Sequence, residues 1–179
     1  CLGCGSEGAW LCHRCGQTIT PIKHPRCPVC RKPRGQQTCA SCKNQTALDG
    51  LVVATAYDLP LTKTLLHTLK YGFAEQIAQA LAETAAASLR RIDRTTRHAM
   101  LDGPTPALLI PVPLHPRRYR ERGFNQSELI ARHLGTSLQL ETVPTGLARH
   151  RYTTPQVSLA RQERQANVSG AFSSVELFK

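Results

Sequence analysis

The chain has 179 residues, of which 41% are hydrophobic and 20% are charged, and its formal net charge is +11 at pH 7. This length allows one ordinary domain and one small additional domain. The sequence shows no secretory signal pattern, and no run approaches the roughly 18 apolar residues needed to span a bilayer. We therefore expect a cytoplasmic protein without membrane insertion, whose positive charge suits a polyanionic partner.

The cysteines form the first recognisable pattern. All eight lie within residues 1–42, in the CxxC pairs Cys1/Cys4, Cys12/Cys15, Cys27/Cys30 and Cys39/Cys42. A CxxC turn directs two sulfurs toward one ion, so two turns complete a closed tetrahedral site that has no open position for catalysis. The pattern predicts two structural zinc ions rather than disulfides, because nothing else in the chain indicates secretion.

The pairing of these turns is open at this point. Sequential pairing is the simpler arrangement, and a cross-braced one would combine pairs one and three and pairs two and four. We interpret His13 and His24 as ordinary surface histidines rather than ligands. Residues 1–46 are predicted to form a double zinc ribbon, which has few large apolar side chains besides Trp10 and needs metal in order to fold.

Residues 47–179 are predicted to form a second domain of the α/β class. Residues 43–50 are interpreted as a linker, and Arg90, Arg91 and Arg94 as cations that favour the carboxyl end of a helix. Hydrophobic periodicity predicts helices at 61–71, 74–91 and 126–134, and it predicts strands at 51–57, 107–110 and 138–143. This order of elements indicates a parallel sheet.

Arginines gather directly after the predicted strand at 107–110. Pro111, Pro113 and Pro116 end the strand, and a loop with Arg117, Arg118, Arg120 and Arg122 follows. Ligands of open α/β sheets bind at this edge, and guanidinium groups beside a helix start capped by Asn125 suit phosphate or diphosphate. A solvated basic loop is the alternative interpretation.

Several of these segments resemble the ComF/GntX family, in which a zinc ribbon precedes a type I phosphoribosyltransferase-like domain. The resemblance rests on the CxxC pairs, Leu69-Lys70-Tyr71-Gly72, the run from Pro111 to Gln126, and residues between Gln156 and Phe172. It implies that the diphosphate of phosphoribosyl diphosphate (PRPP) is bound, with Mg²⁺ as the accompanying ion. The residues so implied are Arg117, Arg118, Arg120, Arg122, Asn125 and Gln126.

The resemblance also implies a mobile loop that closes over the substrate. Its candidate residues are Arg149, Arg151, Gln156, Arg161 and Arg164. Residues 158–166 within it have a pattern compatible with a helix. For Lys70 we favour an ordinary surface position over one near the site.

The family's acidic pair and Thr-Thr-Gly loop, which hold the ribose and its 5-phosphate, do not occur in this sequence. We therefore expect the chain to be a fragment whose sheet is incomplete at its C-terminal side, which would leave an open sheet edge. Whether these residues make a competent enzyme is left open.

Three functions are compatible with these patterns. The first is DNA uptake in natural transformation, with PRPP and single-stranded DNA as ligands; Tyr119 and Tyr152 are the best base-stacking candidates, although each is interpreted first as a loop anchor. The second is a phosphoribosyltransferase acting on an unidentified base or amine. The third is a zinc-ribbon module that recruits a helicase of the uptake machinery.

Overall fold

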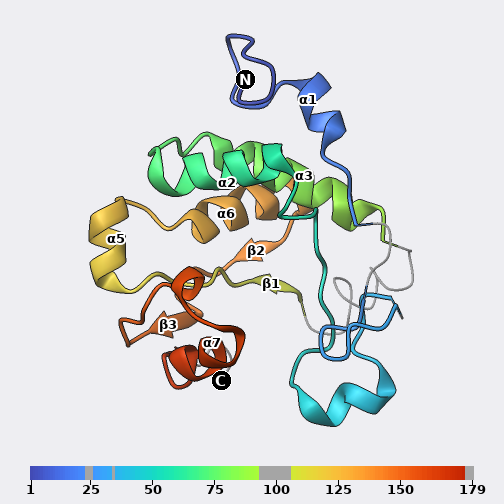
Figure 1. Ribbon diagram of the computed structural model, residues 1–179, viewed down its shortest axis with the longest axis vertical. Helices are drawn as coiled ribbons and strands as arrows, with labels where there is room; N and C mark the ends of the chain where they lie inside the picture. The colour runs from blue at the N-terminus through green and yellow to red at the C-terminus, as the bar shows by residue number, and fades with distance from the viewer. Residues whose placement is uncertain (23–25, 34, 93–105, 176–179) are drawn as a thin grey trace.

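A computed structural model describes residues 1–22, 26–33, 35–92 and 106–175 of the chain. Three helices, α2 (Pro60–Tyr71), α3 (Ile77–Arg90) and α6 (Gln126–Leu138), lie together above the strands β1 (Leu108–Leu109) and β2 (Glu141–Thr142) (Figure 1). The predictions for His24, Arg94 and the residues beyond Val175 lie outside the described residues.

The helical layer forms because each helix has a narrow apolar face. In α2, Leu65 and Leu69 are fully buried, and the buried face of α3 consists of Ile77 and small alanines. These small side chains let α3 pack closely against α6. The core cluster also contains Ile19, from the segment before α2, and Phe124, from the turn directly before α6.

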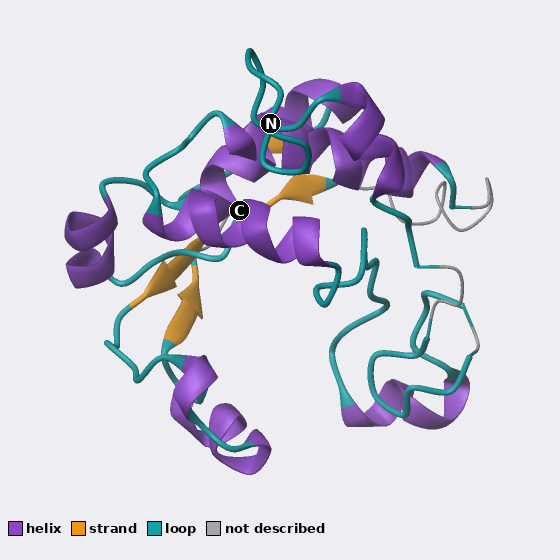
Figure 2. Ribbon diagram, turned by 45° about the horizontal axis from the view of Figure 1, so that its top comes forward, coloured by secondary structure: helices purple, strands orange, loops and turns teal. Residues whose placement is uncertain are grey.

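The strands form two separate pairs (Figure 2). β1 and β2 are parallel, with Leu108 opposite Glu141 and Leu109 opposite Thr142, and α6 lies between them in sequence. β3 (Leu147–Arg149) is antiparallel to β4 (Phe172–Ser174), and the short helix η2 (Gln156–Ser158) and α7 (Arg161–Val168) connect them. The prediction of a mixed α/β chain with parallel pairing is therefore confirmed.

The predicted strand at 51–57 is wrong, because this segment is not a strand in the structure. Side chains hold it instead of a β-ladder: Ser88 Oγ donates to Ala54 O at 2.8 Å, and Thr55 Oγ1 donates to Thr20 O at 3.0 Å. Its β-branched residues satisfied the local preference for a strand, but among the described residues no neighbouring strand pairs with it.

The strand predicted at 138–143 is shorter than expected. The helix α6 continues to Leu138 and ends at Gln139, whose φ of 57° is left-handed, so β2 contains only Glu141 and Thr142. The predicted linker at 43–50 is also partly helical, since η1 spans Ala40–Gln45. The division of the chain into two domains near residue 46 stays a prediction.

The arginines after β1 lie on a helix, so the prediction of a loop there is wrong. Pro116 starts α5 (Pro116–Arg122) with a backbone already restricted to helical φ, and His115 Nδ1 accepts from Arg117 N at 3.2 Å as an N-cap. Within the described ranges, no helix is long and apolar enough to cross a membrane.

The contact between α6 and β2 can be tested at Gly135, which is buried. A Cβ at this position would lie 2.5 Å from Thr142 Oγ1 and 2.8 Å from the carbonyl oxygen of Leu140. Alanine is favoured over glycine in a helix by about 1 kcal/mol, but overpacking against backbone costs more. We expect Gly135→Ala to lower the free energy of unfolding by roughly 1–3 kcal/mol in chemical denaturation.

The exposed neighbour Thr136 provides the control, because Thr136→Ala adds no contact with β2. A Gly135→Ala variant at least as stable as the wild type would show that α6 and β2 are not closely packed.

Candidate anion-binding site and metal clusters

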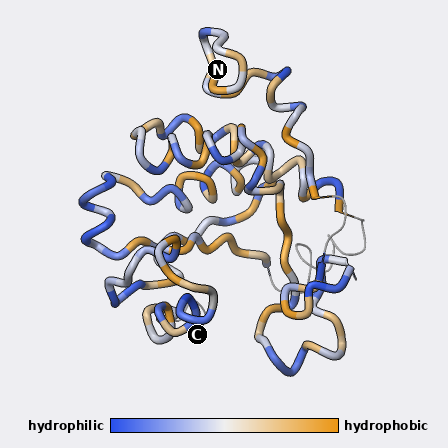
Figure 3. Tube along the Cα trace, viewed as in Figure 1, coloured by the Kyte–Doolittle hydropathy of each residue, from blue (hydrophilic) through white to orange (hydrophobic). Residues whose placement is uncertain are grey.

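The turn that follows α5, residues 123–125, fixes the position of this helix. Gly123 (φ 80°) ends the helix, and the next residue, Phe124, is buried in the core cluster. Asn125 is also buried: its Oδ1 accepts from Ser127 N at 3.1 Å, and its Nδ2 donates to Val112 O at 3.2 Å. These contacts fix α5 relative to α6, while the helix itself is strongly hydrophilic (Figure 3).

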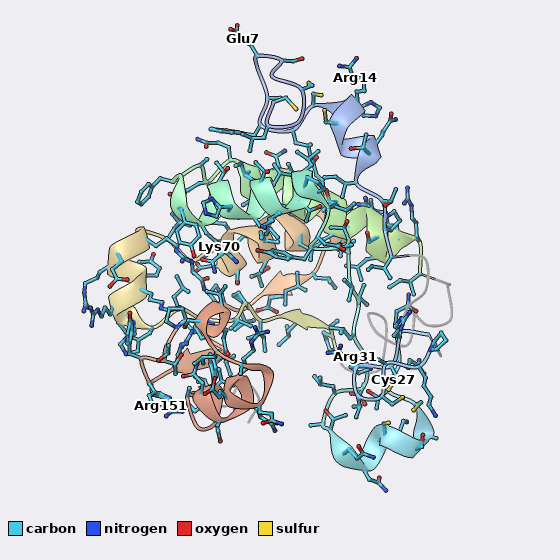
Figure 4. All side chains as sticks on the ribbon, in the orientation of Figure 1. Glu7, Arg14, Cys27, Arg31, Lys70 and Arg151 are labelled. Carbon is cyan, nitrogen blue, oxygen red and sulfur yellow. The ribbon has the colours of Figure 1, made fainter. Side chains whose placement is uncertain are left out.

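A cavity of about 320 Å³ lies between α5 and the carboxyl end of α2. Three segments supply its walls: the end of α2 with the turn after it, one side of α5, and the loop that follows β3. The lining residues are Lys70, Tyr71, Phe73, Arg118, Glu121, Arg122, Tyr152 and Pro155. Figure 4 labels Lys70 in the region between α2 and α5.

The cavity concentrates positive charge. Lys70, Arg118 and Arg122 line it, and Glu121 is the single carboxylate among the described lining residues. That carboxylate is partly neutralised, because its Oε1 lies 3.1 Å from Nε of Arg117. Burial lowers the pKa of Lys70, and the nearby charge of Arg122 lowers it further. The site therefore favours an anion.

Aromatic rings hold the arginines in place. The guanidinium of Arg122 lies 5.4 Å from the ring centre of Tyr71, and that of Arg118 lies 5.4 Å from that of Tyr152. Hydrogen bonds add to this: Arg118 Nη2 donates to Thr153 O at 3.0 Å, and Arg122 Nη1 donates to Gln126 Oε1 at 2.8 Å. The guanidinium groups are thus positioned before any ligand binds.

The predicted diphosphate residues divide into groups. Arg118 and Arg122 line the cavity. Arg117 and Arg120 are exposed and do not line it, although the guanidinium of Arg117 lies 4.9 Å from the ring centre of the lining residue Tyr152. Gln126 orients Arg122 and Asn125 caps α6, so both act through their neighbours. Binding of diphosphate by any of them stays a prediction.

The residues predicted for the mobile loop mostly form hydrogen bonds within their own segment, residues 149–169. Arg149 Nη2 donates to Thr153 Oγ1 at 2.5 Å, and burial, with the charge of Arg118, lowers its pKa. Arg151 Nη2 donates to the carbonyls of Asn167 and Ser169 at 3.1 and 2.6 Å.

Farther along the segment, Gln156 Nε2 donates to Arg164 O at 3.2 Å, and Arg164 Nε donates to Leu159 O at 3.1 Å. Arg161 begins α7. Mobility of this segment stays a prediction.

Sequence reasoning missed part of the cavity wall. Lys70, for which a surface position was favoured, is half-buried in the wall, and Tyr71 and Phe73 were not considered as site residues. The signal that could have identified them is the pair of aromatic residues flanking Gly72, directly after a lysine at the end of a helix.

The cysteines form two clusters with sequential pairing. Cys1, Cys4, Cys12 and Cys15 make one, and Cys27, Cys30, Cys39 and Cys42 make the other; in each, all sulfurs lie within 4.8 Å of one another. The cross-braced alternative is thereby excluded. His13 is exposed and belongs to neither cluster.

The geometry of both clusters suits zinc. A tetrahedral ion with Zn–S bonds of about 2.3 Å separates its sulfurs by about 3.8 Å. Cys4 Sγ and Cys12 Sγ are 3.7 Å apart, and Cys30 Sγ and Cys39 Sγ are 3.8 Å apart. Each cluster could therefore hold a metal ion, and four thiolates are the donor set of a closed structural zinc site.

The thiols of the two clusters differ in acidity without metal. Hydrogen bonds from Ser6 lower the pKa of Cys4 to about 6. Hydrogen bonds with Cys12 and Cys4 raise the pKa of Cys15 to about 11, and burial raises that of Cys42 to about 12. An ion must displace protons from the latter thiols, so its binding strengthens as pH rises.

Taken together, these features define an α/β protein with a basic cavity and two Cys4 clusters that could each hold a metal ion. Over 168 residues the chain is 30% identical to DNA utilization protein YhgH of Escherichia coli O157:H7, covering 92% of this chain and 71% of that protein. Over 166 residues it is 28% identical to competence protein F of Haemophilus influenzae, covering 91% and 69%. The chain belongs to the family of competence protein F (ComF). No family model and no solved structure matches it.

The two clusters differ in how they contact the core, which gives a prediction. Leu2, Leu11 and Ile19 of the first cluster's segment pack in the core cluster, whereas the described residues 26–50 contribute none. We expect Cys15→Ser and Cys42→Ser each to remove one bound zinc ion, measured by elemental analysis of the purified protein. Calorimetry should show a larger loss of melting temperature for Cys15→Ser. Equal losses would contradict the different attachment of the clusters.

A second prediction concerns Lys70, whose charge is disfavoured by burial and by Arg122. A lowered pKa means that the folded state disfavours the ammonium form of Lys70, so this charge destabilises the folded protein at any pH below that pKa. Lys70→Met removes the charge and should leave the melting temperature at pH 7 unchanged or raise it. The same variant should bind inorganic diphosphate more weakly. The exposed Lys63 on α2 provides the control as Lys63→Met. Loss of stability without loss of binding would show that Lys70 is a structural residue.

Proposed function

We propose that this chain acts in DNA uptake or utilisation and that its basic cavity binds the diphosphate group of PRPP. The printed names of the relatives, DNA utilization protein and competence protein F, support the first part. The observation that carries the second is the shared cavity of Lys70, Arg118 and Arg122, which contains more positive charge than Glu121 can balance.

The chemistry of this cavity suits diphosphate better than a neutral ligand. Guanidinium groups offer paired donors that match two oxygens of a phosphate, and an ammonium adds a point charge. The volume of about 320 Å³ is at the small end of the range for ligand pockets. The guanidinium groups of Arg122 and Arg118 are oriented by stacking on Tyr71 and Tyr152, not by pairing with a carboxylate.

The order of elements supports a type I phosphoribosyltransferase-like fold for this part of the chain. A short, half-buried strand, β1, is followed by the arginine helix α5, and α6 then returns to a strand parallel to β1. Ligands of such sheets bind beyond the carboxyl ends of the strands, which is where α5 begins. Mg²⁺ would enter with PRPP, since Glu121 is already bonded to Arg117.

Diphosphate binding can be tested by titration calorimetry with inorganic diphosphate and with PRPP. We expect Arg118→Ala and Arg122→Ala each to weaken binding by roughly 1–3 kcal/mol, as for the loss of a charge-assisted contact. Arg120→Ala removes the same charge from the same helix outside the cavity, so its affinity should stay close to that of the wild type.

Melting temperatures of the variants would show whether the fold is retained. Equal losses for all three variants would point to a diffuse charge effect instead of a site. No binding by the wild-type chain would refute the assignment of the cavity.

A further inference from the structure

Phe73 is an exposed aromatic residue in the wall of the cavity between α5 and the end of α2. Its side chain is large and apolar, yet 66% of the residue is exposed. The other two rings of the wall, Tyr71 and Tyr152, each lie against an arginine. Among the described residues, the ring pairs and cation–ring contacts do not involve Phe73. Its ring is therefore open to a ligand in the cavity.

The backbone of Phe73 is also in an unfavourable conformation. Its φ is 53°, in the left-handed region that residues other than glycine rarely adopt. Helices commonly end with a glycine in this conformation, as α5 does at Gly123 with φ 80°. At the end of α2 the glycine lies one position earlier, since Gly72 has φ −100° and the left-handed position after it is occupied by phenylalanine.

The fold does not explain a phenylalanine at this position. Gly72 is required where it stands, because a Cβ there would lie 2.9 Å from the carbonyl oxygen of Thr68. Phe73, in contrast, could be glycine without loss to the core, since the core cluster of the described residues does not include it. Residues held in strained conformations cluster at ligand sites. The ring of Phe73 therefore points to a ligand.

The cavity combines two kinds of recognition. Lys70, Arg118 and Arg122 suit a diphosphate group, and Phe73 adds a flat apolar ring to the same wall. Aromatic side chains bind nucleobases by stacking whichever the base, because every base has a π-face. Since Phe73 is exposed, a base can lie on it at the opening of the cavity while a diphosphate lies inside. Nucleoside diphosphates contain both groups.

We propose that this cavity binds nucleoside diphosphates, with the diphosphate at its lysine and two arginines and the base stacked on Phe73. The inference rests on the proposed function, because PRPP and a nucleoside diphosphate would place the same group in the same cavity. PRPP contains no base, so the ring of Phe73 adds nothing to its affinity. A nucleoside diphosphate therefore competes with PRPP through a residue on which PRPP does not depend.

Titration calorimetry with ADP and with methyl diphosphate tests this site. Methyl diphosphate is the matched ligand, because it has the diphosphate ester of ADP without the ribose and the base. We expect the chain to bind ADP roughly 5- to 30-fold more tightly, as for one stacked base. Phe73→Leu keeps an apolar side chain but has no π-face, so it should remove most of this difference, whereas Phe73→Trp should retain it. Affinities for PRPP and methyl diphosphate should be the same in both variants as in the wild type.

Tyr119→Leu is the control, because it removes an exposed ring of α5 that does not line the cavity. Its affinity for ADP should equal that of the wild type. Phe73→Gly separates a binding role from a structural one: glycine relieves the backbone, so the melting temperature should be unchanged or higher while ADP binds more weakly. A purely structural Phe73 would give a lower melting temperature and an unchanged ratio of ADP to methyl diphosphate affinity.

Equal affinity of the wild type for ADP and methyl diphosphate would overturn the proposal, and so would an unchanged affinity for ADP in Phe73→Leu. Binding of ADP that depends on Phe73 but not on Arg122 would also overturn it, because the diphosphate would then lie outside the cavity. Binding of ADP and methyl diphosphate without binding of PRPP would refute only the proposed function. Absence of binding for all of these ligands would refute both.

Discussion

Like charges repel, so Lys70, Arg118 and Arg122 can share one cavity only if the fold holds them there. Stacking on Tyr71 and Tyr152 and hydrogen bonds to Thr153 O and Gln126 do this. The carboxylate that lines the cavity, Glu121, is paired with Arg117. The buried Asn125 and Phe124 tie α5 to the helical core, which prevents the arginines from moving apart. The cost appears in the lowered pKa of Lys70 and of Arg149, caused first by burial and then by the neighbouring charges of Arg122 and Arg118. An anion would remove it, which is why we connect the arrangement with ligand binding.

The two Cys4 clusters have the same ligands but different surroundings. The first shares the core: a Cβ at Gly3 would meet Cys15 Sγ at 2.8 Å and Leu61 Cδ2 at 3.3 Å, so only glycine allows this approach. The second is joined to the segment after it by backbone bonds, from Thr38 N to Asp49 O at 2.7 Å and from Leu51 N to Gln36 O at 2.8 Å. A metal ion in the first cluster would therefore stabilise the helices, whereas one in the second would stabilise a separate, basic segment.

The sequence was informative wherever local patterns decide the structure. CxxC spacing predicted that the cysteines gather into two groups of four. Apolar periodicity predicted α2, α3 and α6, because a helix satisfies its backbone hydrogen bonds within itself. The strand at 51–57 was wrong because β-branched residues cannot show whether a partner strand is adjacent. The position of Lys70 was missed because a lysine at a helix end has a sufficient local explanation. Only the placement of α5 across a cavity from the end of α2 makes Lys70 part of a site.

The most direct test is a crystal structure of the chain with inorganic diphosphate. We predict that the anion lies between Lys70, Arg118 and Arg122, with the rings of Tyr71 and Tyr152 remaining against the arginines. Diphosphate bound elsewhere, with this cavity unchanged at saturating concentration, would contradict the account.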